Sequence, residues 1–366
     1  MDQVRIGLVG AGLIGTAHSI MLREITDALD GKVELTAVAD PLVAAREEAQ
    51  RRFGFQHGFA TVGELLRADI NAVFICTPTK FHAELVHQAA ERGLHIFCEK
   101  PLAMSHPEAV AMAAAVQRAG VTTQIGLVLR FSAVYRVIQA QLAQPEMGAP
   151  VAVVFRDDQC FPIRGAHNTS WRKDPTLTAG GTLIEHGVHD LDLLTMLFGP
   201  VARLRAWQQN RAGHAGVEDY MAVELEFASG LRAQLVNLWH DMVQRASNRR
   251  LEIFCEKGFV ASDHDAVGDV LLQIGDGDEG RIGPDEVLLR FESLCGRSDH
   301  RFRHWYGIPY LLQDLSFIEA LLAGHPASPG IDVGVEAQRL AAAVYEAART
   351  GEEIVVAGSG AGAPLR

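Results

Sequence analysis

The chain has 366 residues and a formal net charge of −12, and 48% of its residues are hydrophobic while 21% are charged. This length exceeds what one hydrophobic core usually serves and predicts two domains, and the acidic balance, without any block of lysine and arginine, argues against a nucleic-acid surface. No apolar run has the length of a membrane span, no basic leader precedes the first apolar segment, and the five cysteines are widely spaced, so we expect a cytoplasmic protein with reduced thiols.

Short apolar runs alternate with helical patterns over the first third of the chain. The sequence predicts strands at residues 4–9, 33–39, 72–76, 95–98 and 123–128, and helices at 42–52, 83–92 and 107–119. Strands that alternate with helices form βαβ units, and strands without polar alternation are buried on both faces. We therefore predict a parallel-sheet domain over residues 1–128.

The pattern changes in the second part of the chain. A predicted helix (131–143) and strand (151–155) precede a loop to residue 181 and a helix at 183–198. Strands are predicted at 220–227, 231–239, 250–255, 270–274 and 286–291, and helices at 309–323 and 333–350. Their polar alternation is typical of a mostly antiparallel sheet with one covered face. We predict an α+β domain over 129–356 and a flexible Gly/Ala-rich tail at 357–366.

A GxGxxG motif follows the first predicted strand and precedes a helical pattern. In such a turn Gly10 permits the tight bend, Gly12 lets the backbone approach a pyrophosphate, and Gly15 allows close packing of helix on strand. The start of the helix then faces the phosphate charge. The sequence predicts that a dinucleotide contacts the run Gly10, Ala11, Gly12, Leu13, Ile14 and Gly15.

Asp40 ends the second predicted strand. A carboxylate at this position accepts hydrogen bonds from the ribose diol of NAD and repels the 2′-phosphate of NADP. No basic residue follows it directly, Arg46 being the nearest, so we predict NAD rather than NADP. The alternative is that Asp40 and Pro41 only form a turn.

Lys100 lies where the apolar run 95–98 stops and Pro101 prevents its continuation. Lysine is costly to bury, so one held at the end of a buried strand is better explained as a working cation than as a solvated charge. Pro101 is expected to fix the turn that presents the lysine, with a cis peptide bond as one way to do so.

The helix predicted at 183–198 carries the second group of candidate residues. Ideal helical geometry puts Glu185, His189 and Asp192 on one stripe of an otherwise apolar helix. A histidine oriented by a carboxylate suits general acid–base chemistry on a hydroxyl. The alternatives are a core histidine with an ion pair and a competing pair of His186 with Asp190. We expect no metal site, because the histidines lack an obvious third ligand.

Taken together, these motifs resemble those of the Gfo/Idh/MocA oxidoreductases, along nearly the whole chain. The matching motifs are the GxGxxG run at 10–15, Thr77-Pro78 with His82, Glu99-Lys100-Pro101, Arg130-Phe131, Trp171-Arg172 and Glu185-His186-Gly187-Val188-His189-Asp190. The resemblance implies an α/β protein: an N-terminal Rossmann parallel sheet followed by an α+β domain with a large, mostly antiparallel open sheet. Because that sheet often forms oligomer contacts in the family, we expect a homodimer or homotetramer.

The resemblance also implies an NAD(P)-dependent oxidoreductase that transfers hydride between nicotinamide and a hydroxyl carbon of a sugar, inositol or related polyol. On this chain, Lys100 would polarise the reacting oxygen, His189 would be the general acid/base, and Glu185 would occupy the position of its acidic partner. The family more often has Asp where this chain has Glu185. Residues implied near the nicotinamide, its ribose or the substrate are Thr77, Pro78, His82, Glu99, Lys100, Arg130, Trp171, Arg172, Glu185 and His189.

Two alternative functions remain besides this one. Relatives of this fold include glycosidases that keep NAD bound and eliminate a glycoside through transient oxidation. A non-catalytic cofactor-binding regulator would lose the lysine or the histidine, and both are present here.

The charged loop at 156–173 is interpreted as solvated. The other interpretation is that it recognises a carboxylated or phosphorylated sugar.

Overall fold

The computed structural model describes residues 1–165, 168–296 and 300–356, and it divides into two compact units. The first unit contains Met1–Leu127, Thr176–Ala179 and Tyr310–Gln338, and the second contains the remaining residues. The predicted tail at 357–366 lies outside the described residues. No helix in the described ranges has both the length and the apolar character needed to cross a bilayer.

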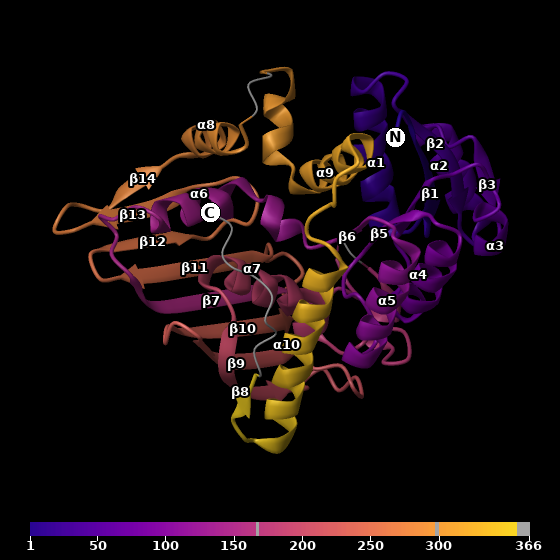
Figure 1. Cartoon of the computed structure of the whole chain (residues 1–366). Helices are drawn as coiled ribbons and strands as arrows, with labels where there is room; N and C mark the ends of the chain where they lie inside the picture. Colours follow the sequence, from indigo (N-terminus) through magenta and orange to yellow (C-terminus); the bar gives the residue numbers. More distant parts are fainter. Residues whose placement is uncertain (166–167, 297–299, 357–366) are drawn as a thin grey trace. The chain divides into compact units, whose positions relative to one another are not determined.

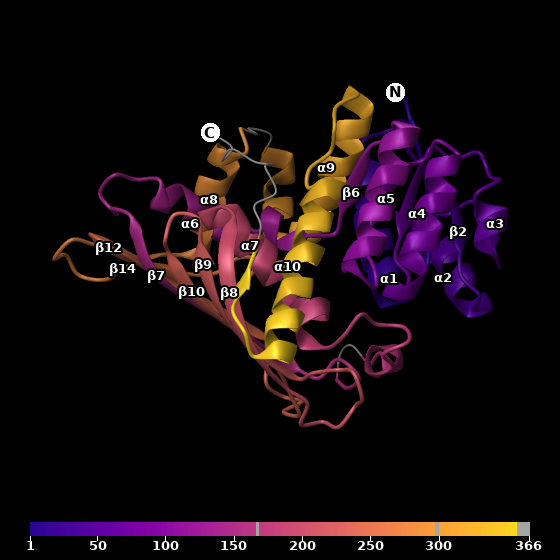
Figure 2. The same ribbon diagram turned by 60° about the horizontal axis from the view of Figure 1, so that its bottom comes forward.

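The first unit is built on a parallel sheet in the order β3-β2-β1-β4-β5-β6. Its strands are β1 (Val4–Val9), β2 (Val33–Ala39), β3 (His57–Phe59), β4 (Ala72–Ile75), β5 (His95–Cys98) and β6 (Thr123–Ile125). Its helices are α1 (Leu13–Ala28), α2 (Val43–Phe53), α3 (Val62–Leu65), α4 (His82–Glu91) and α5 (His106–Ala119). Figure 2 shows α4 and α5 side by side. The predicted parallel sheet is confirmed, and its strand order reverses between β1 and β4, where such folds bind ligands.

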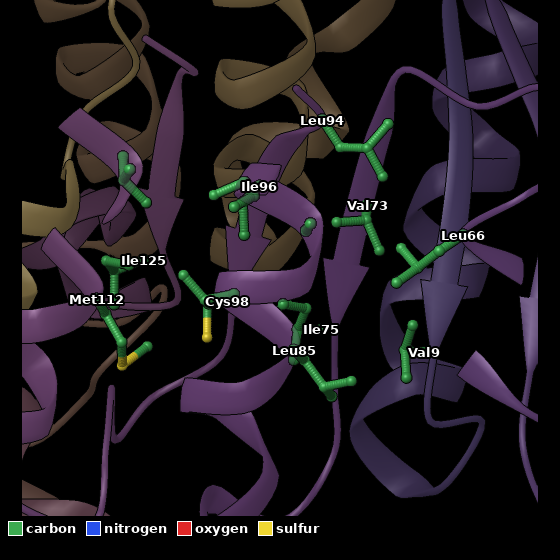
Figure 3. Packing of buried hydrophobic residues seen from close by; sticks show 14 of the residues in the cluster. Val9, Leu66, Val73, Ile75, Leu85, Leu94, Ile96, Cys98, Met112 and Ile125 are labelled. Carbon is green, nitrogen blue, oxygen red and sulfur yellow. The ribbon is translucent and has the colours of Figure 1, made fainter. Parts of the chain in front are cut away.

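The core of this unit explains why a distant segment belongs to it. Val9, Ile75 and Cys98, near the ends of three neighbouring strands, pack in one buried cluster with residues of α4 and α5 (Figure 3). Partly buried side chains of the segment 331–335 pack on the same cluster, and the Ile125 N–H donates to Pro329 O at 2.9 Å. The domain boundary predicted between residues 128 and 129 did not include this distant segment in the first domain, because the contacts join segments about 200 residues apart.

The second unit contains a nine-stranded sheet in the described residues, in the order β14-β13-β12-β11-β7-β10-β9-β8-β15. Only the β7–β10 pair is parallel, which confirms a mostly antiparallel sheet (Figure 1). The strands are β7 (Pro150–Cys160), β8 (Val201–Gln209), β9 (Tyr220–Phe227), β10 (Arg232–His240), β11 (Asn248–Cys255), β12 (Gly258–Ser262), β13 (Val270–Ile274), β14 (Gly280–Ile282) and β15 (Ile354–Val355). Buried and exposed residues alternate along β9 and β10, so one face is covered.

Helical segments complete this unit. They are η2 (Val128–Phe131), α6 (Ala133–Leu142), η3 (Ser170–Lys173), η4 (Leu183–Gly187), α7 (Val188–Phe198), α8 (Pro284–Leu294) and η5 (His300–Gly307). Helices α9 (Pro309–Ala323) and α10 (Ile331–Thr350) follow in the chain. Residues of α10 up to Gln338 belong to the first unit, and those from Arg339 belong to the second.

Three details of the second part differ from the sequence prediction. The strand predicted at 286–291 is wrong: these residues lie in α8, which has Pro284 in its first turn, acidic residues there, and Val287 and Phe291 buried one turn apart. Proline and acidic residues in a first turn favour a helix. Strand β7 extends beyond residue 155 to Cys160, so Asp157 is buried in a strand rather than exposed in a loop. Strands β8, β12, β14 and β15 were not predicted.

Candidate active site

The glycine-rich turn between β1 and α1 has the shape that a dinucleotide needs. Gly10 has a φ of +91°, and a Cβ there would lie 2.7 Å from Cys76 O, while a Cβ on Gly15 would overlap Gly10 O. Above Gly12, by contrast, a Cβ would meet nothing within 4 Å. Gly12 is the N-cap of α1 and supplies no side-chain cap, so the first amide groups of the helix remain available to an anion. The open space and the uncapped helix fit a pyrophosphate.

Asp40 lies at this turn. Its Oδ2 accepts a hydrogen bond from Ala11 N–H at 2.9 Å, and its Oδ1 accepts one from Leu42 N–H at 2.8 Å. The contact with Leu42 N–H is the local turn that was considered as the alternative role of Asp40. The contact with Ala11 N–H brings the carboxylate to the glycine motif. The Arg46 guanidinium donates to the Asp40 carbonyl at 2.6 Å, so a cation also stands beside this position.

Two more candidate segments lie at the ends of β4 and β5. The imidazole of His82 is buried, with Nδ1 2.9 Å from Pro101 O and Nε2 2.9 Å from Thr77 O. Its ring thus ties the turn after β4 to the turn after β5. The Lys100–Pro101 peptide bond is cis, which confirms the expectation for this turn. Lys100 N–H donates to Glu99 Oε2 at 3.1 Å, and Glu99 is buried.

In the second unit, two arginines form ion pairs with carboxylates of the segment that was predicted as a helix at 183–198. Arg130 makes two hydrogen bonds of 2.7 Å to Asp192, a parallel arrangement that fixes both side chains. Arg172 Nε lies 3.1 Å from Glu185 Oε2. The Arg172 guanidinium also stacks on the ring of Trp171, 4.6 Å from its centroid. These contacts pair the predicted Arg130 with Asp192, and the predicted Arg172 with Trp171 and Glu185.

His189 lies in the first turn of α7 and is 5% exposed. The stripe predicted from ideal helical geometry is modified, because residues Leu183–Gly187 form a π-helical turn before α7 begins. Such turns are frequent at functional sites. Glu185, which precedes His189 in the chain, pairs with Arg172, and Asp192, which follows it, pairs with Arg130. Burial raises the pKa of Asp192, against the opposing effect of Arg130.

The start of this helical segment is fixed by Glu218, which the sequence did not single out. The Glu218 carboxylate accepts hydrogen bonds from Gly181 N–H at 2.8 Å, Leu183 N–H at 3.0 Å and the Tyr345 hydroxyl at 2.9 Å. A carboxylate at a helix start binds amide groups that would otherwise lack partners. Thus one buried side chain holds the segment that leads into His189.

Gly181→Ala is expected to lower the free energy of unfolding by about 3 kcal/mol or more, because its Cβ would overlap the Glu218 backbone. Thermal and urea unfolding of the purified protein measure this effect. Gly283→Ala is the matched control, since the position has a φ of −72° and nothing within 4 Å of an added Cβ. Equal stabilities of the two variants would contradict the expectation.

A second polar network, centred on Arg249 and not predicted from the sequence, anchors the same helix to the sheet. Arg249 on β11 bridges three carboxylates, with distances of 2.9 Å to Asp190, 3.1 Å to Asp157 and 2.8 Å to Asp265. Burial raises the pKa of Asp190 to about 7. The negative charge of Asp157 also raises this pKa, whereas the positive charge of Arg249 lowers it. His186 Nδ1 lies 3.2 Å from Asp157 Oδ2, so both members of the competing His186–Asp190 pair belong to this network.

The sequence matches two family models. The model described as "Oxidoreductase family, NAD-binding Rossmann fold" covers residues 4–127, and the "GFO/IDH/MocA C-terminal domain" covers residues 135–261. Among curated relatives, inositol 2-dehydrogenase of Rhizobium meliloti is 28% identical over 97% of this chain and 99% of its own length. Myo-inositol 2-dehydrogenase of Thermotoga maritima is 26% identical over 88% of this chain and 90% of its own.

Solved structures share the fold. A levoglucosan dehydrogenase in complex with NADH superposes with a TM-score of 0.83 at 21% identity, covering 97% of this chain and 99% of that one. The WlbA dehydrogenase of Bordetella pertussis, in complex with NADH and UDP-GlcNAcA, gives a TM-score of 0.82 at 22% identity, covering 98% and 99%. The two matched models together span most of the chain, which therefore belongs to the Gfo/Idh/MocA family of NAD-binding oxidoreductases.

Proposed function

We propose that the chain is an NAD-dependent dehydrogenase of a sugar, inositol or related polyol. The observation that carries the substrate class is the similarity to an inositol 2-dehydrogenase along 97% of the chain. The buried His189 supports this class, as do the arginine pairs of Glu185 and Asp192 on the same helical segment, because a polyol site needs a positioned proton acceptor among polar groups.

Lys100 and His189 are the proposed catalytic residues. The nicotinamide, when bound, supplies the hydride acceptor or donor. Lys100 stabilises the negative charge that develops on the substrate oxygen, and His189 accepts the hydroxyl proton during oxidation or returns it during reduction. Arg130 and Arg172 hold Asp192 and Glu185 in place, so the helix that carries His189 starts from a fixed position.

A panel of polyols tests this function directly. Purified protein is incubated with NAD and myo-inositol, scyllo-inositol or levoglucosan, and NADH formation is followed at 340 nm. NADH formation with one of them supports the proposal. In a parallel incubation with a glycoside, release of a free sugar without accumulation of NADH would instead indicate a redox-elimination glycosidase. NADH binding without any turnover would indicate a regulator.

Asp40→Ser is expected to shift the ratio of kcat/KM for NADP over NAD by about 100-fold toward NADP. The carboxylate repels a 2′-phosphate, at a cost of several kcal/mol when like charges meet, whereas Arg46 beside it would attract one. Steady-state kinetics with both cofactors measure the ratio. Asp69→Ser, at an exposed aspartate paired with Arg5, is the control and leaves the ratio unchanged. An unchanged ratio in Asp40→Ser would exclude its role in cofactor choice.

A homodimer or homotetramer is proposed from the exposed face of the nine-stranded sheet. Val154, Trp207 and Phe254 project from this face with exposures of 41%, 57% and 46%. Large apolar side chains on one sheet face favour association. Light scattering of the purified protein is expected to give the mass of two or four chains, and a mass of one chain at micromolar concentration contradicts it.

A further inference from the structure

A buried cluster of three charged side chains lies in the first unit, and two of them, His18 and Asp314, have so far been assigned no role. His18, one turn into α1, is 0% exposed. Its Nδ1 lies 2.9 Å from both carboxylate oxygens of Asp314 on α9, and its Nε2 lies 3.0 Å from Glu99 Oε1. The three residues come from segments nearly 300 positions apart.

The geometry indicates an imidazolium. A neutral imidazole has one N–H donor, yet both ring nitrogens of His18 face carboxylate oxygens. Burial by itself lowers the pKa of His18, but Asp314 and Glu99 outweigh that effect and raise it to about 10. The ring is also held by aromatic neighbours, with an edge contact to Phe97 at 5.0 Å between centroids.

Glu99 is constrained on its other side as well. Its Oε2 accepts the Lys100 N–H at 3.1 Å. A Cβ on Gly126 would lie 2.5 Å from Glu99 Oε1, so the backbone after β6 closes over the carboxylate. One oxygen thus binds His18 and the other binds the main chain of the residue proposed to be catalytic.

We propose that His18 is a positioning residue for the Glu99–Lys100 turn, linking helix α1 of the cofactor-binding motif to the segment that presents the lysine. Asp314 balances the charge of the imidazolium, which in turn holds the Glu99 carboxylate against the Lys100 amide. This inference rests on the proposed role of Lys100. A positioning role explains why charged residues are buried here, since well-packed apolar residues would fill the same space without the cost of desolvation.

Hydrogen exchange at the Lys100 amide tests the proposal without any substrate. His18→Gln is expected to accelerate exchange of this amide about ten- to hundred-fold, because hydrogen bonds to charged acceptors contribute that much protection. The Cys76 amide, which donates to Val9 O at 2.8 Å, is the internal reference and keeps its rate. Leu22→Ala, fully buried one turn further along α1, is the control for simple destabilisation.

Removal of His18 alone leaves the buried carboxylates of Glu99 and Asp314 without the imidazolium between them and can prevent folding. The double variant His18→Gln/Asp314→Asn removes one positive and one negative charge, so the net charge of the cluster is preserved. It is expected to give the same faster exchange at Lys100. An unchanged ratio of Lys100 to Cys76 exchange in this variant would overturn the proposal.

Kinetics supply a second readout, with the panel compound that is turned over fastest. Positioning through Glu99 predicts that His18→Gln/Asp314→Asn lowers kcat about ten- to hundred-fold with little change in KM or NADH affinity. Adding Glu99→Gln should lower kcat no further, because coupled residues are not additive. If the losses of kcat from His18→Gln/Asp314→Asn and from Glu99→Gln multiply, the positioning role is refuted and the proposed function is not. An active Lys100→Met variant would refute the proposed function instead.

Discussion

Lys100→Met is expected to lower kcat about 10²–10³-fold while the dissociation constant of NADH changes less than about threefold. Methionine keeps a long side chain but removes the ammonium that stabilises negative charge on the reacting oxygen. The effect should fall on kcat, because the charge develops in the transition state rather than in the bound substrate.

Steady-state kinetics and NADH fluorescence titration measure the two quantities separately. Lys32→Met is the matched control, since Lys32 is exposed in the turn before β2. It should leave kcat unchanged. Near-normal turnover of Lys100→Met would show that another group polarises the oxygen.

His189→Ala is expected to lower kcat about 10²–10⁴-fold, the usual contribution of a positioned general acid/base. NADH binding should persist, because the glycine motif and Asp40 belong to the other compact unit. The pH dependence of kcat should also lose the limb that reports the proton acceptor.

His186→Ala tells the two histidines of the motif apart. His186 contacts Asp157 at 3.2 Å in the Arg249 network, so its loss is expected to reduce stability more than turnover. A larger loss of kcat in His186→Ala than in His189→Ala would reverse the proposed assignment.

The sequence could predict those parts of the site that depend on local signals. The glycine motif, Asp40 and Lys100 each follow a short apolar strand, and parallel strands bring their carboxyl ends to one edge of the sheet. The lysine turn needs only the strand and the proline after it. These positions could therefore be identified from a few neighbouring residues.

Residues whose roles depend on distant partners could not be predicted in this way. Glu218 contacts Gly181 and Tyr345, which lie 37 and 127 positions away. Arg249 contacts Asp157, 92 positions away. In sequence, each is one charged residue among many, and His18 appears as an ordinary position of an amphipathic helix. The π-helical turn before α7 was also missed, because it departs from the regular period on which the helical stripe was calculated.

The division of the chain has a consequence for its biosynthesis. The first unit includes Tyr310–Gln338, and the second includes the part of α10 from Arg339 onward, with Tyr345, whose hydroxyl donates to Glu218. Domains usually fold in order as they leave the ribosome. Here neither unit has all its parts until α10 has emerged, so the nascent chain carries both cores unfinished through most of its synthesis, and both are completed by the same late segment.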